Sequence, residues 1–186
     1  YGAGNHVALR RSIFSSFALI GIVTLILNVV VFIWLDPILR LLQVPQDIYG
    51  MMRSYLWIIF CGIVFTFIYN FYASLLRAVG DSVTPLWFLA VSVVLNIALD
   101  LFFILQLDWG IQGAAAATVL AQGVAALGII IYTYRRRPEL RWHHEDMCFD
   151  RTCLKEIASF STLTCVQQSV MNLGILMVQG LVNSFG

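Results

Sequence analysis

The stretch of sequence that decides the fold is Ser12–Leu35, SIFSSFALIGIVTLILNVVVFIWL, in which 24 consecutive residues carry no charged side chain. A helix of about 20 apolar residues is long enough to cross the hydrocarbon core of a bilayer. The run does not alternate apolar and polar residues, as a strand of a membrane barrel would. Because lipid leaves backbone groups to be hydrogen-bonded within the segment, the run predicts a transmembrane helix.

Four further runs of the same kind follow, at about 54–76, 82–107, 109–134 and 157–186, and the only charged residue inside any of them is Asp100. Over the whole chain 60% of the residues are hydrophobic and 11% are charged, against about 25% charged in soluble domains. The sequence therefore predicts an all-α polytopic membrane helix bundle with five transmembrane helices. A net charge of +1 offers no basic surface, so nucleic acid is not an expected partner.

Lys and Arg residues are distributed unevenly between the two ends of these runs. Nine lie before the first run, between the second and third, or between the fourth and fifth, whereas only Arg40 and Arg53 lie on the opposite side. Because cytoplasmic loops are enriched in Lys and Arg, this asymmetry predicts that the loop 135–156 is cytoplasmic. The loop is also long enough to separate two helix bundles.

Asp100 makes insertion of its helix into the membrane less favourable, because a carboxylate at the centre of a span costs about 2.5–3.5 kcal/mol of insertion free energy. Asn96 lies one helical turn earlier on the same face. At 1.5 Å per residue, counted from the hairpin near Asp108, Asp100 lies about 12 Å deep, Asn96 about 18 Å, and Thr118 of the next helix about 15 Å. Their oxygen atoms suit Na⁺ or a proton. The three residues are therefore predicted to bind a coupling cation; a structural role for Asp100 near the outer interface is the alternative.

Other polar residues fall on shared helical faces. Thr118 and Gln122 are spaced by four residues and could line a cavity together. In the last run a stripe of about 60° holds Ser161, Gln168, Asn172, Gln179 and Asn183. Such a stripe faces either another helix or a cavity rather than lipid. Possible cavity-lining residues are therefore Gln122, Gln168, Asn172 and Gln179.

Motifs for catalysis or metal binding are absent from the sequence. It contains no H-E-x-x-H, Gly-rich phosphate loop or nucleophile elbow. His143, His144, Cys148 and Cys153 match no common zinc spacing. The sequence therefore predicts neither an enzyme nor a metalloprotein, and no cofactor beyond Na⁺ or H⁺ as a coupling ion.

Several motifs follow one another along the chain: Tyr1-Gly-Ala-Gly-Asn5 before Arg10-Arg11, Leu76-Arg-Ala-Val-Gly-Asp-Ser-Val-Thr-Pro85, Asn96-Ile-Ala-Leu-Asp100, and Gly110-Ile-Gln-Gly-Ala-Ala-Ala-Ala-Thr-Val-Leu-Ala-Gln122. In this order and spacing they resemble the multidrug and toxic compound extrusion (MATE) transporters. The last run, with Gln179-Gly-Leu-Val-Asn-Ser-Phe-Gly186, is similar to the DinF-like bacterial branch of that family.

The resemblance implies a partial MATE-type fold, with helices three to seven of twelve. Residues 1–134 would be part of the N-lobe, 135–156 the loop between lobes, and 157–186 the truncated first helix of the C-lobe. The remainder of the transporter would be the missing partner. The family's N-lobe cation site, an Asp and an Asn on the fifth helix and a Thr on the sixth, maps onto Asp100, Asn96 and Thr118.

The function that the resemblance implies is a cation-coupled antiporter, in the plasma (bacterial inner) membrane, that exports drugs or small organic metabolites by alternating access. Its partners would be a small organic substrate and membrane lipid. One alternative is a lipid-linked oligosaccharide flippase of the same superfamily; these often use cationic cavities, whereas no Lys or Arg lies inside a run here. The other is a non-transporting membrane scaffold subunit, in which Asp100 would serve helix association alone.

Overall fold

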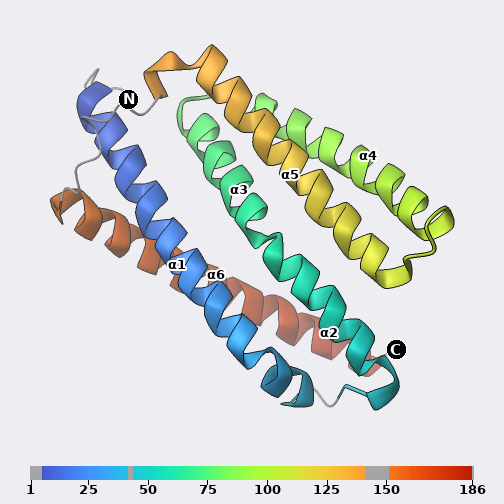
Figure 1. The fold of residues 1–186 in the computed structure, drawn as a ribbon. Coiled ribbons are helices and arrows are strands. Elements are labelled where there is room, and N and C mark those ends of the chain that lie inside the picture. Colours follow the sequence, from blue (N-terminus) through green and yellow to red (C-terminus); the bar gives the residue numbers. More distant parts are fainter. Residues whose placement is uncertain (1–5, 42–43, 141–150, 186) are drawn as a thin grey trace.

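The computed structural model describes residues 6–41, 44–140 and 151–185, and within these ranges the chain is helical apart from short turns (Figure 1). The elements in chain order are α1 (His6–Leu41), α2 (Gln46–Cys61), α3 (Ile63–Ala78), α4 (Val83–Leu105), α5 (Gly110–Arg136), the short 3-10 helix η1 (Pro138–Leu140) and α6 (Arg151–Phe185). The prediction of an all-α helix bundle is confirmed.

Four helical stretches among the described residues are long and apolar enough to cross a membrane: Leu9–Leu41, Gln46–Ala78, Val83–Leu105 and Gly110–Arg136. They contain most or all of the first four predicted runs. The fifth run forms α6, and its crossing of the membrane stays a prediction. Helices also occupy both ends of the predicted loop 135–156, since α5 ends at Arg136 and α6 begins at Arg151; residues 141–150 of that loop lie outside the described residues.

At its C-terminal end α1 runs past the predicted border at residue 35 and continues to Leu41. The charged residue that ends the apolar run, Asp36, is neutralised by α2. Arg53 Nε donates a hydrogen bond to Asp36 Oδ1 at 2.8 Å, and the Tyr49 hydroxyl donates to the same oxygen at 3.0 Å. These contacts join the C-terminal part of α1 to α2.

Gly62 interrupts the second span, which the sequence predicted as one continuous helix, and divides it into α2 and α3. The break is slight, because the Gly62 N–H still donates to the carbonyls of Ile58 and Ile59, at 3.1 and 3.0 Å. Asn28 of α1 donates from Nδ2 to the carbonyl of Phe60 at 2.8 Å. A backbone carbonyl beside the break thus has a side-chain partner, as a span in lipid requires.

α5 is the central helix of the bundle and contacts α2, α3 and α4. Its buried positions are mostly small residues, namely Gly113, Ala115, Ala117, Ala121, Gly123, Ala125 and Ala126. Small side chains let helix backbones approach closely, which is how helices associate in lipid. The approach to α4 leaves no spare room at Gly128, where an added Cβ would lie 2.7 Å from the Phe88 ring.

The turn between α3 and α4 is tied to α5 through Asp81. Its carboxylate accepts hydrogen bonds from the Thr84 N–H at 3.1 Å, the Thr84 hydroxyl at 2.8 Å and the Tyr132 hydroxyl at 3.4 Å. Partial burial raises the pKa of Asp81, but the hydrogen bonds from Thr84 and Tyr132 and the charge of Arg137 outweigh it. The pKa of Asp81 therefore lies below its ordinary value of 3.8.

Replacing this carboxylate tests the turn. Folding lowers the pKa of Asp81, so its ionised carboxylate stabilises the fold at pH values above the pKa that it has in the unfolded chain. This stabilisation is lost as the pH falls through the lower pKa of the folded state. Asp81→Asn is expected to reduce the unfolding temperature at pH 7 by roughly 2–4 °C, and by less at about pH 3. Thermal unfolding of the detergent-solubilised protein at both pH values measures this. Asp108→Asn in the exposed α4–α5 hairpin is the control, and a loss for Asp81→Asn that is equal at both pH values would contradict the assignment.

Candidate functional site

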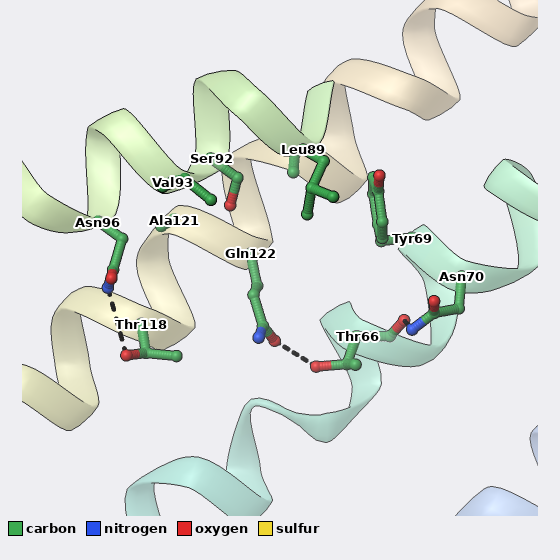
Figure 2. A pocket seen from close by; sticks show the side chains of 11 residues that line it. Thr66, Tyr69, Asn70, Leu89, Ser92, Val93, Asn96, Thr118, Ala121 and Gln122 are labelled. Carbon is green, nitrogen blue, oxygen red and sulfur yellow. Dashed lines mark hydrogen bonds between the residues drawn. The ribbon is translucent and has the colours of Figure 1, made fainter. Parts of the chain in front are cut away.

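A cavity of about 290 Å³ lies between α3, α4 and α5 (Figure 2). Each of the three helices contributes a pair of polar side chains spaced four residues apart: Thr66 and Asn70 from α3, Ser92 and Asn96 from α4, Thr118 and Gln122 from α5. A further polar side chain of α3, Tyr69, also lines the cavity, and its hydroxyl donates to the carbonyl of Pro85 at 2.7 Å. Residues at this spacing share one face of a helix. The fold therefore directs three polar pairs toward one space within the apolar bundle.

Asn96 and Thr118, two of the predicted cation-binding residues, are in contact across α4 and α5. Asn96 Nδ2 donates to Thr118 Oγ1 at 3.3 Å (Figure 2). The Thr118 hydroxyl in turn donates to the carbonyl of Ala114 at 3.0 Å. The depths counted from the α4–α5 hairpin thus place the two side chains at matching heights. Their role in cation binding stays a prediction.

Asp100, the third predicted member, lies one turn beyond Asn96 on α4 and is not among the residues that line this cavity. Its side chain is half-buried. Oδ1 is fully buried and has no hydrogen-bond partner within the described part of the chain. A buried acceptor without a partner is costly, so this oxygen has an unused capacity to bind a proton or a cation.

Gln122, a predicted cavity-lining residue, lines the cavity and accepts a hydrogen bond from the Thr66 hydroxyl of α3 (Figure 2). Thr66 and Asn70 were not singled out from the sequence. Their spacing of four residues inside a charge-free run was the available signal, and it is the same signal that Thr118 and Gln122 carry. Ser92 extends the stripe of Asn96 and Asp100 by one turn in the same way.

Two of the three predicted lining residues of α6 lie elsewhere. Gln168 and Asn172 are exposed, and neither lines the cavity between α3, α4 and α5. Gln179 belongs to α6, but its side chain lies outside what the structure describes. A part in lining a cavity stays a prediction for all three.

A second, wider cavity of about 710 Å³ lies between α1 and α3. Its polar lining consists of Ser12, Ser16 and Thr24 from α1 and Thr66, Asn70 and Ser74 from α3. Thr66 and Asn70 line both cavities. The rest of the lining is apolar and includes the rings of Phe67 and Phe71, and the volume is within the range of about 300–1,000 Å³ that holds small organic ligands.

Comparison with known proteins relates this arrangement to membrane transporters. The family model described as MatE matches residues 1–102. The probable multidrug resistance protein YpnP of Bacillus subtilis (strain 168) is 35% identical over 158 residues, which cover 81% of this chain and 34% of YpnP. YoeA of the same organism, also a probable multidrug resistance protein, is 28% identical over 193 residues, which cover 100% of this chain and 42% of YoeA.

Solved structures share the helix arrangement. The Vibrio cholerae MATE transporter VcmN in its bent form superposes with a TM-score of 0.79 at 23% identity, over 97% of this chain and 44% of that one. A MATE protein in the bent conformation superposes with a TM-score of 0.70 at 21% identity, over 82% and 39%. The prediction of a partial MATE-type fold is confirmed, and the chain spans less than half the length of these proteins.

The hydrogen bond between Thr66 and Gln122 can be measured by a double-mutant cycle. Thr66→Val alone leaves the partly buried Gln122 amide oxygen without this partner, whereas adding Gln122→Leu removes both polar groups. We expect the pair to be coupled by about 0.6–1.7 kcal/mol, as interhelical hydrogen bonds in membrane proteins are. Unfolding in mixed detergent micelles measures the four free energies. Additive single effects would show that the contact contributes nothing.

Proposed function

The chain belongs to the MatE family, and we propose that it is part of a cation-coupled antiporter that exports drugs or small organic metabolites by alternating access. In support, curated relatives are named as multidrug resistance or multidrug export proteins. The chain covers 34% of YpnP and 42% of YoeA, so the whole activity would need the helices that the rest of a transporter supplies.

The observation that carries this proposal is the unpartnered oxygen of Asp100. The Oδ1 atom of Asp100 is buried inside an otherwise charge-free span. An ionised carboxylate in that position raises the free energy of the conformation when no cation or proton is bound to it. A Na⁺ ion or a proton bound there removes that penalty. Asn96 lies one helical turn from Asp100 and contacts Thr118, and both side chains carry neutral oxygen atoms of the kind that hard cations prefer.

Alternating access follows from the change in charge at Asp100. With a cation or proton bound, the carboxylate can stay buried. Without one, a conformation that exposes the carboxylate to water is favoured. A ligand shifts such an equilibrium only by its difference in affinity between the two states. A cation or proton that binds one state better would therefore drive the exchange for substrate.

The wider architecture in this proposal has two lobes. Residues 1–134 form part of the N-lobe, 135–156 the cytoplasmic loop between lobes, and 157–186 the first helix of the C-lobe. Gln168, Asn172 and Gln179 would then line the opposite wall of a substrate pathway. The lining of the two cavities described above includes no Lys or Arg, which disfavours the flippase, because anionic lipid-linked sugars call for cationic surfaces.

Asp100→Asn in the full-length gene product tests the proposal. Asn keeps the size of the side chain but cannot be ionised, so export of a cationic dye such as ethidium is expected to be abolished while the amount of protein in the membrane is unchanged. Dye accumulation in cells, with membrane protein quantified by immunoblot, measures both.

Asp108→Asn is the matched control, because Asp108 is exposed at the α4–α5 hairpin; it should export the dye like the wild type. Wild-type export by Asp100→Asn would remove Asp100 from the mechanism.

A further inference from the structure

Gly62 lies at the break between α2 and α3, directly against Val119 of α5. Gly62 is buried, and a Cβ added there would lie 2.5 Å from Cγ2 of Val119 and 3.1 Å from Cγ1. Carbon atoms in ordinary contact are about 3.5–4.0 Å apart. Any side chain at position 62 would therefore have to displace Val119, or α5 itself, by about 1 Å.

The glycine is required for space rather than for backbone conformation. Gly62 has φ −75° and ψ −10°, which are angles that any L-amino acid adopts. Its interruption of the span therefore does not by itself explain a glycine. The close approach of Val119 does.

Val119 has little freedom to move aside. It is β-branched, and such a side chain in a helix has one strongly preferred rotamer. α5 is also packed against α4 on another side, where an added Cβ at Gly128 would lie 2.7 Å from Phe88. A displacement at Val119 is therefore transmitted to the backbone of α5 rather than absorbed by a side chain.

The polar contacts of the cavity lie within one turn of this steric contact. Thr66 follows Gly62 by four residues, and Gln122, which accepts its hydrogen bond, follows Val119 by three. Thr118, which accepts from Asn96, is the neighbour of Val119 in sequence. In Figure 2 Thr66 and Gln122 point toward one another from α3 and α5. A shift of α5 away from Gly62 therefore separates Gln122 from Thr66. The same shift moves Thr118 relative to Asn96.

We propose that Gly62 is a positioning residue for the polar cavity: its missing side chain sets the distance between α3 and α5 at which Gln122 meets Thr66, and so holds α5 where Thr118 also meets Asn96 of α4. The inference rests on the proposed function, because the quantity that this distance controls is the affinity for the coupling ion.

Four variants of the full-length gene product test the inference: Gly62→Ala, Val119→Ala, the double variant Gly62→Ala/Val119→Ala, and Gly50→Ala as control. Gly50 is also a helical glycine of the second span, but an added Cβ there meets nothing within 4 Å. Each purified protein is titrated with NaCl at constant ionic strength and, separately, with acid, while tryptophan fluorescence reports the midpoint of the response.

Gly62→Ala is expected to shift the midpoint to an ion concentration about 10- to 100-fold higher, since misplacing binding groups by about 1 Å carries a penalty of that order. Val119→Ala removes both Cγ atoms, so the double variant should return to within about threefold of the wild-type midpoint. If the two substitutions only destabilised the protein, combining them would not restore the midpoint. Gly50→Ala should keep the wild-type midpoint.

An unchanged midpoint in Gly62→Ala, with a responsive wild type, overturns the positioning role and leaves the proposed function intact. If Gly62→Ala does not accumulate in the membrane, the double variant decides. Its recovery to wild-type amount and midpoint supports the inference, and its failure to recover overturns it. A wild type that responds to neither Na⁺ nor protons overturns the proposed coupling, and the inference with it.

Discussion

A polar group inside the bilayer must find its partner within the protein, and the polar core of this chain is arranged around that requirement. Asn28 reaches across to the carbonyl of Phe60 beside the break in the second span. Thr66 meets Gln122, and Asn96 meets Thr118. Among the described residues, Ser15 Oγ and Asp100 Oδ1 are the two buried side-chain atoms without a hydrogen-bond partner, and of the two only Asp100 is an acid. A group left unsatisfied in such a setting is the natural place for a mobile cation or proton.

Short polar side chains can meet only if the helices that carry them lie close together. The small residues of α5 make this possible on the sides of both α3 and α4, and the spaces at Gly62 and Gly128 would not admit even a methyl group without movement. Packing and polar contact are therefore not separate properties of the bundle. The close approach of the backbones is what allows Thr66 and Gln122 to reach each other.

The three helices around the cavity are also joined at the turn that follows α3. Asp81 accepts hydrogen bonds from Thr84 at the start of α4 and from Tyr132 near the end of α5. Toward the other end of the bundle, Arg53 joins α2 to Asp36 of α1. These ionised groups thus lie toward the ends of the membrane-spanning stretches or in the turn between them, and the neutral polar pairs lie between. This arrangement keeps Asp100 as the one acid deep in the described spans.

The sequence by itself determined that the chain lies in a membrane, where most of its spans run, and how far along its helix each polar residue is placed. Lipid excludes charge and leaves the backbone to bond within each span, so charge-free runs such as Ser12–Leu35 are read directly as helices. A rise of 1.5 Å per residue placed Asn96 and Thr118 within about 3 Å of each other in depth. Only the tertiary structure decided which faces meet. The sequence around Gly62 does not tell whether this glycine breaks a helix, packs against a neighbour or does neither. The partner of Gln122 lies 56 positions away in the sequence. Contact between helices depends on their rotation and separation, and the spacing of residues along one helix does not record either.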